Sequence, residues 1–306
     1  MGVTGFPLAL LALLALLASA LVSACHGAEG PALATAGCPS CGEVAERGAI
    51  RGGDVAECSG AVAGVVHPEV LYVHNDRGDV ARFFAIGVDG VARGEFDVTG
   101  ATAVDWEDVG RGPSGPEGKS FLYFGDIGDN DRSRASYAIY RVEEPQEIGA
   151  GKHAVTAEAI PFVYPDGSHD AEALLVHPVT GAITLVIKED GSSRIYELPL
   201  PITSGKTVTL VAAGTVKPPL GSSSITAGDV HPGGHGVLLR TKSDVFFYPM
   251  TPDQTLAQAL AAAPCLLPSA GEDQGESIAW LPGGWDYVTI GEGVGAPIHG
   301  VACGAP

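Results

Sequence analysis

Pairs of carboxylates precede short apolar segments in this sequence, where they could bind a cation or transfer a proton. Asp170 and Glu172 lead into the apolar segment 173–176, and the next apolar segment, 183–187, ends at Lys188. Two such runs of β-branched and apolar residues, joined by a Pro- and Gly-containing turn, predict a β-hairpin. Because the first strand of a hairpin starts where the second ends, we expect these ionisable side chains at one edge of a sheet.

The same hairpin recurs along the chain. In three copies a glutamate stands six residues before the turn proline: Glu107 before Pro113, Glu172 before Pro178, and Glu276 before Pro282. Two further copies are marked by Pro68 and Pro232, with Val62 and Thr226 at the glutamate position. A repeat of about 50 residues with short strands and Gly/Pro turns is typical of propeller blades.

We therefore predict an all-β fold, a five-bladed β-propeller of four-stranded antiparallel meanders. The last copy is one strand short, and a strand from residues 43–55 is expected to complete it and close the ring. Six blades remain an alternative, because the interval from Pro113 to Pro178 is long enough to hold extra strands. A short helical pattern at 255–263 interrupts the fourth copy.

The net charge of −19 lies wholly after the first 25 residues. Such an excess of acid disfavours nucleic acid and anionic membrane surfaces as partners, and it favours solubility and the binding of cations. The 43 glycines and 22 prolines are spread through the repeats, as expected for a turn-rich β protein rather than a disordered one. We expect a monomer that meets a membrane only through a lipid anchor.

The chain is predicted to have three parts. Residues 1–24 are an export signal, because an apolar stretch too short for a comfortable membrane span ends in small residues. Residues 25–41 form a flexible tether and residues 42–306 the propeller. The segment before Cys25 is similar to a bacterial lipobox, although it lacks Lys and Arg, so Cys25 is the predicted lipidation site. A lipoprotein of the outer or cell-envelope membrane, a plainly secreted protein and a retained transmembrane helix all remain open.

The cysteines indicate structural disulfides. Cys38 and Cys41 have the C-x-x-C spacing of zinc or redox sites, but no second pair completes a zinc site and no βαβ pattern surrounds them. Disulfides are the better interpretation for an exported chain. A bond between Cys303 and an N-terminal cysteine would tie the two ends of the chain together.

In a propeller, the starts of the inner strands and the ends of the second strands gather around the axis at one face. The carboxylates at these places are Asp105, Glu107, Asp108, Asp170, Glu172 and Glu276 at inner-strand starts, and Asp76, Asp126, Asp129, Glu189 and Glu292 at second-strand ends. Carboxylates so close together repel one another unless a proton or a cation neutralises them. Ca²⁺, which takes six to eight oxygen ligands in loose geometry, suits such a site.

We predict an axial Ca²⁺ site whose ligands are Glu107, Asp126, Asp129, Glu172 and Glu276. The alternative is that these side chains cap turns and line a wet channel.

Other polar side chains are expected at the same face. His169 or Asp170 could act as a general base. Lys188 and Arg240 could orient a substrate, or could only pair with carboxylates.

The two asparagines of the chain, Asn75 and Asn130, each begin an Asn-Asp-Arg tripeptide that follows the second strand of successive blades. Turn formation explains such a tripeptide. Its repetition at equivalent places also predicts a substrate-binding role near the axis.

Several motifs resemble those of a family of exported bacterial propellers related to phytase-like, esterase-like propeller domain proteins. They are HND (74–76), DWEDV (105–109), GDIGDN (125–130), DAEALLVHP (170–178) and QGESIAW (274–280), and the resemblance covers about residues 58–295. By analogy with propeller phytases and lactonases, it implies a catalytic Ca²⁺ and hydrolysis of a phosphoester, ester or lactone. The chain departs from the phytases in its few Lys and Arg residues. The alternative function is a non-catalytic cell-surface propeller that binds a glycan or protein partner.

Overall fold

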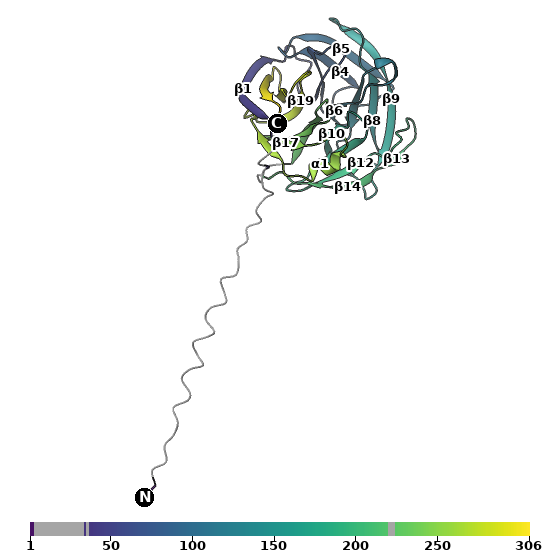
Figure 1. The fold of residues 1–306 in the computed structure, drawn as a ribbon. Coiled ribbons are helices and arrows are strands. Elements are labelled where there is room, and N and C mark those ends of the chain that lie inside the picture. The colour runs from purple at the N-terminus through teal and green to yellow at the C-terminus, as the bar shows by residue number, and fades with distance from the viewer. Residues whose placement is uncertain (3–33, 35–36, 220–223) are drawn as a thin grey trace.

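The computed structural model describes residues 1–2, 34, 37–219 and 224–306, and in this part of the chain nearly all regular structure is β-strand (Figure 1). The exceptions are the short helix α1 (Leu256–Leu260) and the 3₁₀ turn η1 (Pro116–Gly118). Helix α1 begins at the N-cap Thr255 with a capping box to Gln258, within the predicted helical segment. The predicted export signal and Cys25 lie outside the described residues. No helix within the described ranges is long and apolar enough to cross a membrane.

The strands form successive four-stranded antiparallel units. The first two units contain β2 (Cys58–Ala63), β3 (Val70–Asn75), β4 (Arg82–Gly87) and β5 (Ala92–Thr99), then β6 (Trp106–Arg111), β7 (Phe121–Asp126), β8 (Tyr137–Glu143) and β9 (Lys152–Val163). Parallel pairing of β5 with β9 joins these two units into one sheet, and β13 (Val208–Thr209) also pairs with β9.

The remaining units are separate four-stranded sheets. They contain β10 (Ala171–Val176), β11 (Ile183–Ile187), β12 (Ser193–Glu197) and β14 (Val211–Val216); β15 (Ile225–Val230), β16 (Gly236–Thr241), β17 (Val245–Pro249) and β18 (Cys265–Leu267); and β19 (Gly275–Trp280), β20 (Tyr287–Gly291), β21 (Pro297–Gly304) and β1 (Ser40–Ala49).

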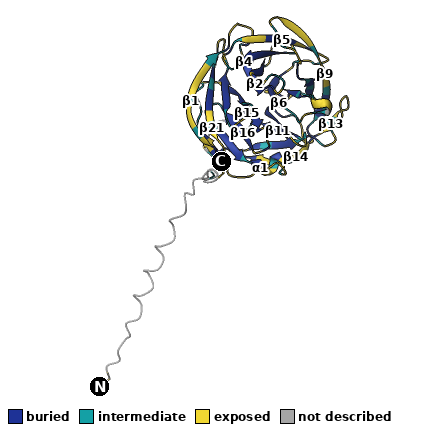
Figure 2. Cartoon of the chain, turned by 45° about the horizontal axis from the view of Figure 1, so that its top comes forward, coloured by how far each residue is buried: buried dark blue, intermediate teal, exposed yellow. Residues whose placement is uncertain are grey.

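The first strands of these units surround a common centre. β2 contacts β6, β6 contacts β10, β10 contacts β15, β15 contacts β19, and β19 contacts β2 again. Every residue of these strands except Arg111 is buried, whereas β1 and β5 at the periphery carry many exposed residues (Figure 2). The chain is therefore an all-β protein in which antiparallel sheets close around an axis, as a propeller fold requires.

The core is divided among the interfaces between neighbouring units. One hydrophobic cluster packs Phe83 of β4 and Trp106 of β6 together, and another packs Phe247 of β17 against Trp280 of β19. Three further clusters fill the other interfaces in the same way. The two tryptophans of these clusters, Trp106 and Trp280, are at most 2% exposed.

An N-terminal strand completes the last unit. β1 pairs antiparallel with β21, so the first and the last strand lie side by side (Figure 1). The prediction of a closing strand is confirmed, but the strand begins and ends earlier than the predicted 43–55.

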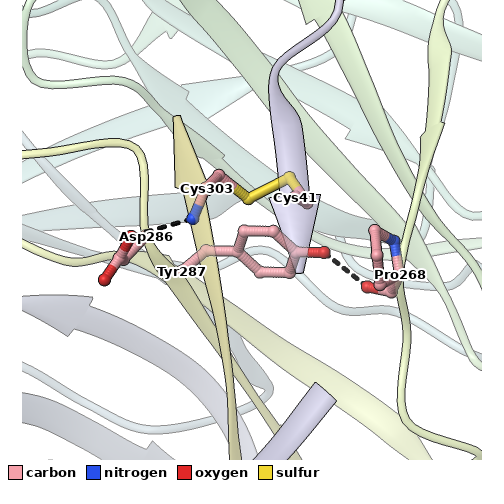
Figure 3. Close-up of a disulfide and its surroundings, with 5 residues drawn as sticks. All are labelled: Cys41, Pro268, Asp286, Tyr287 and Cys303. Atoms are coloured by element: carbon pink, nitrogen blue, oxygen red, sulfur yellow. Dashed lines mark hydrogen bonds between the residues drawn. A yellow bond between two sulfur atoms is a disulfide. The ribbon is translucent and has the colours of Figure 1, made fainter. Parts of the chain in front are cut away.

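Two disulfides reinforce this closure. Cys41 of β1 is bonded to Cys303 of β21 (Figure 3), and Cys38 is bonded to Cys265 of β18. Next to the first bond, the Cys303 amide donates to Asp286 and the hydroxyl of Tyr287 donates to the Pro268 carbonyl. The C-x-x-C pair thus makes two separate structural disulfides that join the segment around the start of β1 to two units, which confirms the predicted structural role.

Candidate axial carboxylate site

Each of the five inner strands contains a β-bulge at the same place. Along β6, Trp106 is opposite Asp126 and Asp108 is opposite the next residue, Gly125, so that Glu107 is left without a partner on β7. The residues at the equivalent places are Ser59, Glu107, Glu172, Thr226 and Glu276. A bulge re-aims the extra side chain. All five residues are nevertheless at most 5% exposed, so the bulges place three glutamates inside the protein.

The bulges correct the expected register of the first unit. The structure confirms the equivalence of Glu107, Glu172, Thr226 and Glu276, but places Ser59 rather than Val62 with them. Val62 packs in the core between the first two units. The turn explains the error: Pro68 lies five residues after the end of β2, whereas each of the other turn prolines lies two residues after its strand.

Inner-strand starts and second-strand ends meet at one edge of the sheets, as predicted. The Asp76 amide donates to the Glu57 carbonyl, and the Lys188 amide donates to the Asp170 carbonyl, both at 2.8 Å. Equivalent bonds run from Ile127 to Asp105 and from Glu292 to Gln274. This repeated closure brings acidic residues from different units to the same end of the axis.

Two groups of carboxylates result, and they share Glu107. Asp76, Asp105 and Glu107 can present oxygens within 4.8 Å of one another, and so can Glu107, Asp170 and Glu172. These are the groups of three or more potential metal ligands found in the described ranges. Gly128 leaves room for them, since a Cβ there would lie 2.1 Å from Glu107 Oε1.

Burial makes the charged forms of these acids costly. It raises the pKa of Asp105 to about 6, with a further contribution from the charge of Asp76. It also raises the pKa of Glu107 well above its ordinary value, and the nearby Glu172 adds to this effect. Asp105 Oδ1 and Glu172 Oε2 are buried and accept no hydrogen bond from any described residue. These two oxygens therefore lack a hydrogen-bond donor, and a bound cation would supply the positive charge that stabilises them.

One internal cation partly meets this need. The Lys188 ammonium pairs with Glu172 Oε1, and its charge also lowers the pKa of Glu107 and Glu276. Burial nonetheless outweighs the ammonium and leaves the pKa of Glu172 raised, to about 8. Lys188 was predicted to bind substrate or to pair with carboxylates, and the structure shows the pairing.

The predicted ligands Asp126 and Asp129 have other partners. Arg134 pairs with Asp126 at 2.8 Å, and the Asp105 amide donates to the same carboxylate at 3.0 Å. Partial burial would raise the pKa of Asp129, but hydrogen bonds from the Ser133 and Arg134 amides and from Tyr137 outweigh it and hold that pKa below its ordinary value. Neither aspartate belongs to the two carboxylate groups.

Glu276 and Arg240 lie near other side chains and outside the two carboxylate groups. Glu276 is 5% exposed and 3.8 Å from the Lys242 ammonium, outside the two groups. Arg240 is fully buried and pairs with Glu272 at 2.7 Å, while its other donors reach carbonyls such as that of Ser277. It therefore stabilises the protein interior and has no donor directed at the axis.

The asparagines are not equivalent. Asn75 is the last residue of β3; it accepts from the Ala56 amide and donates to the Asp54 carbonyl and to Asp79. Asn130 lies four residues beyond the end of β7 and is exposed. The residue that corresponds to Asn75 in the second unit is Asp126. The two Asn-Asp-Arg tripeptides therefore do not occupy equivalent positions, and the prediction that they do is wrong.

His169 is buried away from the carboxylate groups. Its Nε2 lies 2.9 Å from Asp166 Oδ1, its ring stacks on Tyr196, and Tyr164 meets it edge-on. Its Nδ1 is enclosed and has no hydrogen-bond partner in the described chain. Asp170, the other predicted base, accepts from the Asp129 amide at 2.6 Å and faces Glu107 and Glu172.

No protein-family model matches this chain, and no curated protein matches it. Among solved structures, the chain is similar to a crystal structure of glucose dehydrogenase, with 11% identity and a TM-score of 0.48. That likeness covers 85% of this chain and 99% of the other. No statement about function follows from a likeness of this size.

The raised pKa values predict how stability depends on pH when metal is removed by EDTA. A folded state that binds protons more tightly than the unfolded chain loses stability as the pH rises through the folded pKa. For Glu172 this loss continues up to about pH 8, and the raised pKa of Glu107 acts in the same direction. Burial lowers the pKa of His74 and His231 to about 4. These two histidines therefore make stability increase with pH, but only below about pH 6.5.

We therefore expect the free energy of unfolding to fall by about 1 kcal/mol or more between pH 6.5 and 8. Glu107→Gln, which removes one titrating group and its repulsion of Glu172, should flatten this slope. Urea titrations at several pH values measure both. A free energy that stays constant or rises over this range in the wild type would contradict the electrostatics described for the site.

Proposed function

We propose that this chain is a five-bladed β-propeller that binds a divalent cation, Ca²⁺ in particular, at the acidic end of its axis. The ligands are Glu107, Asp170 and Glu172, with Asp76 and Asp105 completing the oxygen set. The observation that carries the proposal is the pair of carboxylate groups that share Glu107 and contain buried oxygens without donors. The five equivalent bulges and the closed ring of inner strands support the blade count.

Calcium fits the ligand chemistry better than a transition metal. All the ligands are carboxylate oxygens, which hard cations prefer, and no histidine or cysteine of the described chain joins either group. Ca²⁺ also tolerates the irregular arrangement that bulges from different strands provide. Burial and the charges of nearby carboxylates raise the pKa of Glu107, and two positive charges would offset both effects.

We propose that the protein is exported, anchored through Cys25, and that the cation supports hydrolysis of a phosphoester, ester or lactone. A bound divalent cation would polarise the substrate oxygen and lower the pKa of a bound water. Of the two residues predicted as bases, only Asp170 belongs to a carboxylate group, where it serves as a ligand of the cation and accepts a hydrogen bond from the Asp129 amide.

A non-catalytic propeller that binds a glycan or protein partner is the second candidate. Lys188, Arg240 and Asn75 were predicted to bind a substrate, but each forms ion pairs or hydrogen bonds within its own chain. The lack of side chains available to orient a substrate favours this second function. A panel of phosphoesters, esters and lactones separates the two functions. Turnover that requires Ca²⁺ and Asp170 supports the hydrolase, and its absence across the panel supports the binding protein.

The cation proposal predicts a thermal shift. In millimolar Ca²⁺ the melting temperature should exceed that in EDTA by roughly 5–10 °C, because a ligand at 100 times its Kd adds about 2.7 kcal/mol to the stability of a folded protein. Glu107→Gln should abolish most of the shift, since Glu107 belongs to both carboxylate groups. Glu158→Gln, which changes an exposed carboxylate paired with Arg141, is the matched control and should keep it.

A wild-type protein with equal melting temperatures in Ca²⁺ and EDTA would refute the cation site. A shift retained in Glu107→Gln would place the cation elsewhere.

Lys188 should compete with the cation, because its ammonium pairs with Glu172 Oε1, an oxygen that Ca²⁺ would bind. Lys188→Met is expected to tighten Ca²⁺ binding by about tenfold, or about 1.4 kcal/mol, in isothermal titration calorimetry. Lys242→Met is the control: Lys242 lies 3.8 Å from Glu276, outside the carboxylate groups, and its loss should change the affinity less. Weaker binding by Lys188→Met would show that Lys188 supports the site instead of competing for it.

A further inference from the structure

A small polar pocket of about 280 Å³ opens beside the last unit, at the same end of the axis as the carboxylate groups. The segment 271–274, the end of β20 at Gly291 and Glu292, and the start of β21 at Pro297 and His299 line it. The Glu292 amide donates to the Gln274 carbonyl, which joins two of these lining segments. His299 is on the third strand of this unit, about 10 Å from inner strand β19 at the usual strand spacing. The pocket is therefore distinct from the axial site.

A buried carboxylate orients the one imidazole in the pocket lining. His299 Nδ1 lies 2.8 Å from Glu272 Oε1, and the Glu272 side chain is 5% exposed. The same oxygen accepts from the Thr289 hydroxyl at 2.9 Å, and Oε2 accepts from Arg240 at 2.7 Å. A carboxylate held by a guanidinium only accepts hydrogen bonds, so Nδ1 must donate the proton it shares with Glu272.

This tautomer leaves the lone pair of the neutral imidazole on Nε2. Within the described chain Nε2 makes no hydrogen bond, and the His299 side chain is 19% exposed, so a molecule in the pocket can reach it. A carboxylate that orients an imidazole in this way is the base–orienter pair of nucleophilic and general-base catalysis. His169 differs, because its unpaired nitrogen is enclosed by protein.

Arg240 fixes this arrangement from inside the protein. Its Nη1 donates to the Ser277 carbonyl and its Nε to the Thr241 carbonyl, so the guanidinium cannot move away from Glu272 without losing both bonds. Gly275 makes room for it, since a Cβ there would lie 1.6 Å from Arg240 Nη2. Arg240 and Glu272 are thus positioning residues for His299.

The charges in the pocket select the kind of substrate. Asp273 and Glu292 also line the pocket. The nearby cations have other partners, because Arg240 pairs with Glu272 and Lys242 donates a hydrogen bond to Gln274. A phosphate or a free carboxylate would be repelled, while a neutral or cationic ester would not.

We propose that His299 is a catalytic base that hydrolyses a small neutral or cationic carboxylic ester in this pocket, independently of the axial cation. Nε2 accepts a proton from a water molecule as the water oxygen bonds to the ester carbonyl carbon. The bond from that carbon to the alcohol oxygen then breaks, and the imidazolium returns the proton to the leaving alkoxide. One ester and one water give one acid and one alcohol.

The test measures release of p-nitrophenol from p-nitrophenyl acetate in EDTA, where the axial site is empty of metal. The wild type should exceed the buffer rate, and p-nitrophenyl phosphate should not be hydrolysed under these conditions. His299→Gln should lose at least about tenfold of the enzymatic rate. It should keep the Ca²⁺-dependent rise in melting temperature, which separates this proposal from that of the axial cation. The matched control is His153→Gln, which changes an exposed histidine bonded to the Gly149 carbonyl and should keep the rate.

A wild-type rate equal to that of buffer, or an unchanged rate in His299→Gln, overturns the proposal. Carbethoxylation of the wild type with diethyl pyrocarbonate covers the case in which the variant does not fold. Mass spectrometry should find His299 modified in step with the loss of rate, and full modification of His299 without loss of rate overturns the proposal as well.

Discussion

The desolvation of carboxylates at one end of the axis is the constraint on which the rest of this structure depends. A buried carboxylate needs a hydrogen-bond donor, a proton or a cation. Asp108 and Asp229 meet this need with backbone amides: Asp108 accepts from Val109 and Leu174, and Asp229 accepts from Val230 and Trp280. Each aspartate thereby fastens one inner strand to the next unit. These two acids stabilise the ring, although burial still raises the pKa of Asp229 to about 6.

The glutamates on the bulges lack such donors. Glu107 accepts a hydrogen bond from the Ser59 hydroxyl, and Glu172 pairs with Lys188, but Glu172 Oε2 has no partner in the described chain. Regular strand pairing would not leave an inner-strand residue unopposed in all five units. The repeated bulge therefore produces two classes of buried acid. Asp108 and Asp229 hold neighbouring sheets together, and Glu107 and Glu172 on the bulges are available to bind a cation.

The fold was largely predictable because its signals are local and repeated. The turn prolines and apolar runs gave the meanders, and the missing strand of the last unit pointed to the N-terminal strand. The site was predictable only in part. Glu107 and Glu172 follow from the repeat, but Asp126 and Asp129 were expected at the axis because they stand at a strand end, and only the folded loop shows Arg134 and Tyr137 holding them. The pairing of Glu272 with His299 spans 27 residues and two strands of the sheet, so no spacing reveals it.

The central claim is that the buried carboxylates sharing Glu107 bind a divalent cation. The most direct measurement is a crystal structure of the protein grown with Mn²⁺, which replaces Ca²⁺ at oxygen sites and is located by its anomalous scattering. The account predicts an anomalous peak among Glu107, Asp170 and Glu172, with the Lys188 ammonium displaced from Glu172. A map without a peak there, with Lys188 still paired to Glu172, would contradict it.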